Sequence, residues 1–271
     1  MGESGVGERM KDNEITKVNL LSTYMNNPFF KFLLRRVIIP CSFMNFAKII
    51  ESKIVFEYLD INRDERICDI ACGCGEHSIK MAKKSCEVYG IDVDEKGIKI
   101  AKVLSENKCN FIVGNAEKLP LKSEVFDKVV SVCALEHFRN DVKAIQEMSR
   151  IVKPDGVLVL TVDSFTYKGV KKEIQDKHKV RHHVVNYYSV SKLTKKVEKC
   201  GFKVEKTKYF INSPLSVLFF NLSVKNVWIS TIVFPFTLVI TILSDLVHGR
   251  KDEGIFLAVK AKKVDHRWKS L

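Results

Sequence analysis

The sequence predicts an α/β fold in which a mostly parallel sheet is covered by helices on both faces. Short β-branched runs alternate with helix-like runs from residue 66 to residue 162. This alternation is typical of parallel sheets whose strands are joined by crossover helices. The first strand-like run ends in a turn of small residues, after which a helix-like run begins. In such sheets the ligand lies beyond the carboxyl ends of the strands, at the topological switch point.

The individual elements follow from the local pattern. Strands are expected at 66–71, 87–92, 110–113, 127–132 and 156–162, and helices between them at 76–84, 94–106 and 141–152. The helix at 141–152 has its apolar residues on one face and stops at the turn Lys153-Pro-Asp-Gly156. A further helix is expected at 190–200, and strands at 202–210 and 255–260.

The turn after the first strand, Asp69-Ile-Ala-Cys-Gly-Cys-Gly75, is the most informative segment. Its glycines let backbone N–H groups approach a ligand closely. A dinucleotide site would have a third glycine, in the pattern G-x-G-x-x-G, where this chain has Ser78. The turn instead resembles motif I of the class I S-adenosylmethionine (SAM) methyltransferases, D-x-G-x-G-x-G. Ala71 replaces the first glycine, which costs little unless this residue needs a positive φ.

Four later segments resemble the same family, in the same order. They are Tyr89-Gly-Ile-Asp92 (motif II), Gly114-Asn-Ala-Glu-Lys-Leu-Pro120 (G-D-A-x-x-L-P), Phe126-Asp-Lys-Val129 (F-D-x-V) and Ile151-Val-Lys-Pro-Asp-Gly156 (L-K-P-G-G). The resemblance covers roughly residues 50–210, and 254–262 fit the last strand. It implies a doubly wound, seven-stranded, mostly parallel sheet whose last strand is antiparallel. The apolar residues before that strand predict a hydrophobic helical insert.

The resemblance also assigns residues to the cofactor SAM. Glycine-turn backbone would lie against the methionine and ribose, Asp69 would orient the methionine amino group, and Asp92 would hold the ribose hydroxyls. Asn115 replaces the family's usual Asp beside the adenine, and its amide oxygen can still accept a hydrogen bond. The full set of expected cofactor contacts is Asp69, Ala71, Cys72, Gly73, Gly75, Asp92, Val93, Asn115, Ala116 and Cys133.

The acceptor side is less defined by the sequence. His137, after the fourth strand, is a candidate base, with a packing role as the alternative. His178, His182 and His183 lie in what we expect to be a substrate loop, where, with Lys177, Lys179 and Arg181, they could bind an anionic head group. His182 and His183 are the candidate substrate contacts among them, and a solvated loop without that role is the alternative. Cys72, Cys74 and His77 resemble metal ligands in type, but cysteines two residues apart in a tight turn do not build a four-ligand site. No metal is therefore expected.

The charge of the chain is concentrated in its second part. Residues 1–164 contain 24 basic and 24 acidic residues, whereas residues 165–271 contain 21 basic and 8 acidic residues, which accounts for the net charge of +13. Because this part also holds the most apolar segment, we expect contact with an anionic membrane surface. The alternative is a solvated lysine-rich surface. Nucleic acid is a less favoured partner, because Cys133-Ala-Leu-Glu136 stands where amino-methylating nucleic-acid enzymes have N-P-P-Y or D-P-P-Y.

The apolar segment at 227–243 approaches the length of a membrane span. A single crossing would separate the strands at 202–210 and 255–260, and the 39 residues of 211–249 are too few for two crossings of about 20 residues each plus a turn. We therefore expect the insert to lie in the membrane interface, with a helical cap on the core as the alternative. Since no secretory signal is apparent and the cysteines look reduced, the predicted location is cytoplasmic, peripheral or monotopic on the inner membrane face.

These observations give four expected regions: an N-terminal amphipathic helical cap at 1–49, with a basic helix at 28–39; a SAM-binding core at 50–210; the hydrophobic insert at 211–249; and the last strand with a basic tail at 250–271. The predicted function is SAM-dependent methyl transfer to an apolar small molecule or lipid at a membrane surface. The core motifs are similar to those of quinone and prenyl-lipid methyltransferases. The alternatives are an RNA or protein methyltransferase and a non-catalytic SAM-binding protein, and the oligomeric state stays open.

Overall fold

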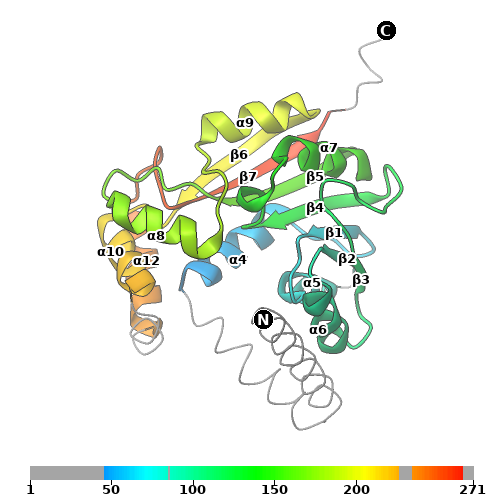
Figure 1. Cartoon of the computed structure of the whole chain (residues 1–271), viewed down its shortest axis with the longest axis horizontal. Helices are drawn as coiled ribbons and strands as arrows, with labels where there is room; N and C mark the ends of the chain where they lie inside the picture. The colour runs from blue at the N-terminus through cyan, green and yellow to red at the C-terminus, as the bar shows by residue number, and fades with distance from the viewer. Residues whose placement is uncertain (1–45, 85, 226–233, 265–271) are drawn as a thin grey trace, which may run out of the picture. The chain divides into compact units, whose positions relative to one another are not determined.

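A computed structural model describes residues 46–84, 86–225 and 234–264 (Figure 1). These residues form a seven-stranded sheet with the order β3-β2-β1-β4-β5-β7-β6. The strands are β1 (Arg66–Ile70), β2 (Glu87–Asp92), β3 (Asn110–Val113), β4 (Phe126–Val132), β5 (Val152–Asp163), β6 (Phe202–Phe210) and β7 (Phe256–Lys263). β7 is antiparallel to both β5 and β6, and the remaining neighbours are parallel. The predicted fold class is confirmed.

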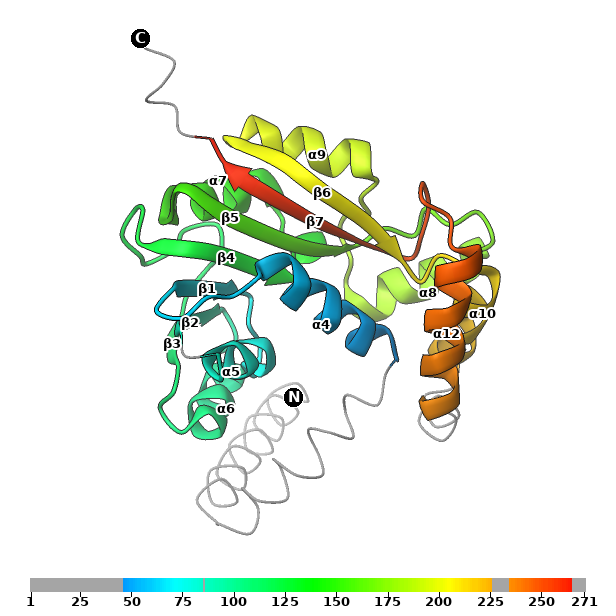
Figure 2. The same cartoon turned by 180° about the vertical axis from the view of Figure 1, so that it is seen from behind.

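Helices cover both faces of this sheet (Figure 2). α4 (Phe46–Leu59), α5 (Glu76–Ala82) and α6 (Glu95–Ser105) share one apolar core with the sheet, and α7 (Asp141–Ile151) and α9 (Val190–Lys199) share the other. Successive side chains of a strand point to opposite faces, so Ile67 of β1 lies in the first core and Cys68 in the second. The order of the strands changes direction between β1 and β4, which puts the switch point there.

The ranges of β1, β4, β5 and β7 differ from those predicted, and two of these differences have a local cause. β1 ends at Ile70 because Ala71 has φ 58°, a left-handed conformation that cannot continue a strand. β5 begins at Val152, before the expected turn, because Val152 pairs with Phe126 of β4. The pairing register then shifts, and the Lys153–Gly156 segment forms a bulge within the strand.

Two helices were not predicted from the sequence. α4 begins at Phe46, before the expected core boundary at residue 50. α8 (Lys172–His182) occupies the segment expected to be a loop, so the loop assignment of His182 is wrong, and His183 is the C-cap of this helix. α8 buries only Ile174 and His178, and therefore lacks the apolar stripe by which a helix is usually detected.

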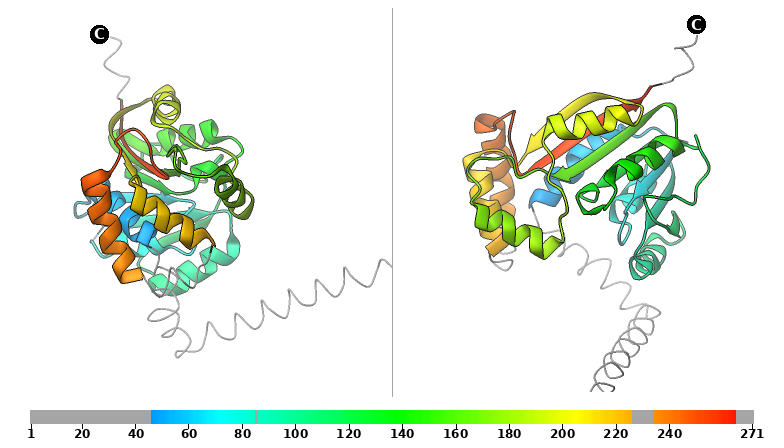
Figure 3. Two further views of the ribbon diagram at one scale, coloured as in Figure 1. Left: turned by 90° about the vertical axis from the view of Figure 1, so that its left-hand side faces the viewer. Right: turned by 45° about the horizontal axis from the view of Figure 1, so that its top comes forward.

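The insert between β6 and β7 is helical, as expected. α10 (Pro214–Lys225) and α12 (Phe234–His248) lie side by side (Figure 3). The carboxylate of Asp245 accepts hydrogen bonds from the backbone N–H groups of Ile211, Asn212 and Ser213 at 2.9, 3.2 and 3.0 Å, which ties α12 to the end of β6. No helix within the described ranges has the length and hydropathy of a membrane span. The expected basic helix at 28–39 lies outside the described residues.

Candidate active site

The turn after β1 is built from left-handed residues at alternate positions. Ala71, Gly73 and Gly75 have φ values of 58°, 54° and 78°. Gly75 also needs its missing side chain, since a Cβ there would lie 2.5 Å from Cζ of Phe111. A Cβ at Gly73 would meet nothing within 4 Å, so the backbone of Gly73 borders open space at the carboxyl end of β1. That space is where a ligand would contact the turn.

Asp92, at the end of β2, fixes this turn from the side. Its carboxylate accepts hydrogen bonds from the N–H of Gly73 at 2.7 Å and from the N–H of Asp94 at 2.8 Å. A carboxylate offers about four acceptor sites, so Asp92 retains acceptors for the two hydroxyls of a ribose. The next residue, Val93, is 75% exposed and presents an apolar side chain at the same edge.

Asp69 lies beneath the turn rather than on its surface. It is 2% exposed, and its Oδ2 accepts a hydrogen bond from Oγ of Ser78 in α5 at 2.6 Å. Burial raises the pKa of Asp69 to about 7. Ser78, which stands where a dinucleotide site would have its third glycine, therefore holds the helix to the strand. A contact of Asp69 with the cofactor remains a prediction.

The remaining expected cofactor residues follow β3 and β4. Asn115 forms a turn in which its Oδ1 accepts a hydrogen bond from the N–H of Glu117 at 2.8 Å, and Ala116 packs partly buried against the core. Gly114 joins this turn to β2 by donating to the carbonyl of Asp92 at 2.9 Å. Cys133 follows β4 with φ 43°, and its N–H donates to the carbonyl of Thr161 at 3.0 Å. The carboxyl ends of β1 to β4 thus carry all the residues assigned to the cofactor.

An acidic cluster, defined here as Glu51, Glu136 and Asp163, lies at the carboxyl ends of β4 and β5. Ligand atoms of Cys133, Glu136 and Asp163 all lie within 4.8 Å of one another. Glu51 reaches the same place from α4, where its Oε1 accepts hydrogen bonds from Sγ of Cys133 at 2.9 Å and from Oγ1 of Thr161 at 2.6 Å. Cys72, Cys74 and His77 form no comparable group within the described residues.

All three carboxyl groups of the acidic cluster are buried. Burial, followed by the charge of the neighbouring acid, raises the pKa of Glu136 well above its usual range. The same two causes raise the pKa of Asp163 to about 7, and burial also raises that of Glu51. Negative charge in this enclosed place is therefore costly unless a proton or a cation accompanies it.

Histidines of α8 border the acidic cluster. The ring of His178 is buried, and its Nδ1 lies 3.6 Å from Oδ2 of Asp163. The centroid of that ring lies 4.5 Å from the ring of His182 and 4.6 Å from the ring of Phe165. Desolvation lowers the pKa of His178 to about 4 and also lowers that of His182, so both rings are neutral at pH 7.

The predicted acceptor residues lie on the outer side of this group. His137 is exposed in the short helix η2 (Leu135–His137), and desolvation lowers its pKa. His182 and His183 are also exposed. Their roles remain predictions, whereas the acidic cluster that they border was missed. One signal was present: Glu51 is an acidic residue within the apolar run of α4.

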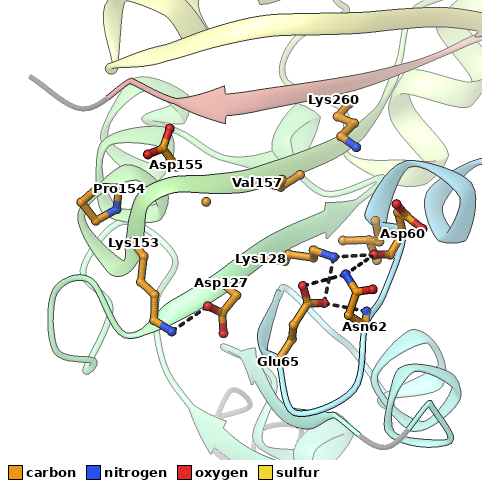
Figure 4. A pocket seen from close by; sticks show the side chains of 12 residues that line it. Asp60, Asn62, Glu65, Asp127, Lys128, Lys153, Pro154, Asp155, Val157 and Lys260 are labelled. Atoms are coloured by element: carbon orange, nitrogen blue, oxygen red, sulfur yellow. Dashed lines mark hydrogen bonds and ion pairs between the residues drawn. The ribbon is translucent and has the colours of Figure 1, made fainter.

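A polar pocket of about 350 Å³ lies at the other end of the strands, away from the cofactor turn (Figure 4). It surrounds the amino ends of β1 and β4, where Nζ of Lys128 pairs with Glu65 at 2.8 Å and Nζ of Lys153 pairs with Asp127 at 2.6 Å. Because ligands of this fold class bind at the carboxyl ends of the strands, this pocket is separate from the cofactor turn.

The strand order, the left-handed glycine turn and the aspartate at the end of β2 together define a class I SAM-dependent methyltransferase. Its residues fit SAM, since the open backbone at Gly73 and the acceptors of Asp92 face the same edge. Residues 61–209 match the model of a methyltransferase domain family, and the chain belongs to that family.

Individual proteins are similar to parts of this chain. An uncharacterized protein of Methanocaldococcus jannaschii is 28% identical over 207 residues, which cover 67% of this chain and 78% of that protein. The demethylmenaquinone methyltransferase of Staphylococcus carnosus is 30% identical over 112 residues, covering 40% of this chain and 46% of the enzyme. This chain thus matches less than half the length of that enzyme. The structure of a SAM-dependent methyltransferase from Mesorhizobium loti has a TM-score of 0.58 at 17% identity, covering 78% of this chain and 96% of the other.

The chain is therefore a SAM-dependent methyltransferase. SAM, when bound, supplies a methyl group already activated by a sulfonium. The protein has to align the acceptor with that methyl group and exclude water.

Proposed function

We propose that this methyltransferase acts on an apolar small molecule or lipid at a membrane surface. The observation that carries the proposal is the apolar face of α10 and α12. Within the described residues, ten of sixteen exposed large apolar side chains belong to these two helices, and Phe236 and Leu246 are 75% and 79% exposed. The ten are Leu215, Leu218, Leu222, Phe236, Val239, Ile240, Ile242, Leu243, Leu246 and Val247.

The spacing of these side chains produces continuous stripes. On α10 they recur at intervals of three and four residues, and on α12 at intervals of one to three, which places them along one broad side of each helix. Exposed apolar patches of this kind mark sites of contact with other molecules or with membranes. Basic residues stand beside the stripes: Arg250 and Lys251 are exposed just after α12. An anionic surface would contact both the apolar and the basic groups.

The apolar helices also adjoin the acidic cluster. α12 contacts α4, which carries Glu51, and α10 contacts α8, which carries His178. The ring of Phe220 in α10 lies 5.8 Å from that of Phe165, between centroids, and Phe165 lies two residues beyond the end of β5. An acceptor with an apolar body could therefore keep that body at α10 and α12 while its reacting end reaches the carboxyl ends of β4 and β5.

Flotation of the full chain with anionic lipid vesicles tests the membrane contact. We expect the parent protein to float and the variant Leu243→Ser/Leu246→Ser to lose most of that binding, because each substitution removes an exposed apolar side chain that would enter the interface. Val142→Ser, an exposed position on α7, is the control and should float like the parent. A parent protein that stays in the soluble fraction would contradict the proposal, and so would complete release by salt, which indicates a purely electrostatic contact.

A further inference from the structure

We propose that the acidic cluster of Glu51, Glu136 and Asp163 binds the amino group of the methyl acceptor, so that the reacting atom is an amine nitrogen. This inference deepens the proposed function and rests on it, because it takes the carboxyl ends of β4 and β5 as the acceptor side. The cluster adjoins the cofactor residues through Cys133. The backbone of Cys133 is assigned to SAM, and its Sγ lies 2.9 Å from Oε1 of Glu51.

The charge of the cluster points to a cationic ligand. In the described part of the chain, neither Glu136 nor Asp163 forms an ion pair with a lysine or arginine, and the neighbour of Asp163 at ion-pair distance is His178. Glu136 and Asp163 each raise the cost of a negative charge on the other, and Glu51 adds to that cost. A protonated amine supplies the positive charge and three N–H donors at once.

Two buried polar atoms lack partners within the described structure and lie in this cluster. Oε1 of Glu136 accepts a hydrogen bond from the N–H of Asp163 at 3.1 Å, whereas its Oε2 accepts none. Nδ1 of His178 has no hydrogen bond either and lies 3.6 Å from Oδ2 of Asp163. Buried polar atoms are nearly always bonded in native proteins, so two unpartnered polar atoms beside an acid indicate the place of a hydrogen-bonding ligand.

The surroundings favour an organic amine over a metal ion. The ring of Phe165 lies 4.9 Å from that of Tyr187 and 5.8 Å from that of Phe220, between centroids, which gives the site an aromatic wall. Aromatic faces attract ammonium groups and accommodate the carbon atoms attached to them. Sγ of Cys133 already donates to Oε1 of Glu51 at 2.9 Å, so this thiol is engaged within the cluster.

Methyl transfer to an amine requires the removal of one proton, and the acidic cluster can accept it. The acceptor enters as an ammonium and transfers one proton to a carboxylate of the cluster, which frees the nitrogen lone pair. That pair forms the N–C bond to the methyl group, and the electrons of the breaking C–S bond stay on sulfur, which becomes neutral. The product leaves as an N-methylammonium, and the proton held by the carboxylate returns to water.

Calorimetric binding of two matched probes tests this inference on the full chain with S-adenosylhomocysteine present. n-Octylamine and n-octanol have the same apolar chain and differ in the end group. We expect the parent protein to bind octylamine at least about tenfold more tightly, because a charge-assisted hydrogen bond is worth about that factor. Glu136→Gln and Asp163→Asn should each reduce the preference to about twofold. Glu173→Gln, an exposed position on α8, is the control and should keep the parent preference.

Equal affinity of the parent protein for the two probes would overturn the inference, and this comparison depends on no variant. A titration of chelator-treated protein with zinc or magnesium chloride provides the second arm. Stoichiometric metal binding that Glu136→Gln abolishes would identify a metal site instead. Since the assay contains no vesicles, its failure leaves the membrane proposal standing, and failure of flotation leaves the amine preference standing.

Discussion

The cofactor turn and the proposed acceptor site are built in different ways. On the cofactor side, at β1 and β2, backbone groups of one short segment form the site, and three left-handed residues within five positions give it its shape. On the acceptor side, at β4 and β5, side chains from residues 51, 136, 163 and 178 meet from separate helices and strands. The first is defined by conformation and the second by charge and burial. A contiguous turn can be recognised in a sequence, whereas an assembled cluster requires the fold.

The largest expected effect is on the helical insert that adjoins the proposed acceptor side, and it should leave the cofactor side unchanged. Asp245→Ala removes an acceptor of three backbone N–H groups at the base of α10 and α12. We expect a loss of about 2–4 kcal/mol of unfolding free energy, measured by urea denaturation. Affinity for SAM should change little. Asp252→Ala, at an exposed position nearby, should be near neutral, and an equal loss in that variant would contradict the assignment.

Asp92→Ala, on the cofactor side, should instead weaken SAM binding. It removes the carboxylate that orders Gly73 and that we expect to hold the ribose. SAM affinity should fall by about 1.5–3 kcal/mol in calorimetry. Asp94→Ala provides a matched control, since Asp94 caps α6 through the N–H of Lys96 and should affect stability more than affinity. Unchanged SAM affinity in Asp92→Ala would remove Asp92 from the site.

Each side holds one aspartate whose pKa is raised, so the pH dependence of stability can be compared between the two sides. Asp69 and Asp163 each have a pKa of about 7, above the ordinary 3.8, so the folded state holds a proton that the unfolded state loses. The stability that each contributes is complete below pH 4 and disappears as the pH rises to about 7. Asp69→Asn and Asp163→Asn do not titrate, so each variant should gain up to about 2 kcal/mol over the parent between pH 5 and pH 7.

Urea unfolding at both pH values measures this gain. The lowered pKa values of His77 and His178 act in the opposite direction, and desolvation, which neither substitution removes, is the main cause of both. Asp163→Asn also removes the acid that contributes to the raised pKa of Glu136, so Asp69→Asn is the simpler of the two comparisons. If the difference in unfolding free energy between variant and parent is the same at pH 5 and pH 7, the carboxyl group is already ionised at pH 5.

Ala71→Gly is expected to have the smallest effect. Its φ of 58° is strained for a residue with a Cβ, so glycine should stabilise the free protein by roughly 0.5–1 kcal/mol. Ala144→Gly, in the middle of α7, should destabilise it by about the same amount. Thermal unfolding distinguishes the two signs, and a loss of stability in Ala71→Gly would show that the alanine is needed for packing.

The sequence could predict the sheet and the cofactor turn because both depend on local patterns. The β-branched runs, the stop at Lys153–Gly156 and the glycines at 73 and 75 each indicate their structure within a few residues. Ala71 illustrates the limit, since the residue type alone does not report its positive φ. α8 escaped prediction because its buried positions are too few to form a stripe. The contact between Glu136 and Asp163 could not be predicted, because it depends on the pairing of neighbouring strands and not on spacing in the sequence.

The position of β7 has a consequence for how the chain is synthesised. β7 pairs with β5 on one side and β6 on the other, although it follows both in the sequence. While a ribosome has not yet released residues 256–263, β5 and β6 each present an unpaired edge, and α10 and α12 already expose their apolar side chains. Unpaired edges and apolar surface are the features that drive nascent chains to associate with one another. The last strand therefore closes the sheet and ends the period in which the chain is most prone to aggregate.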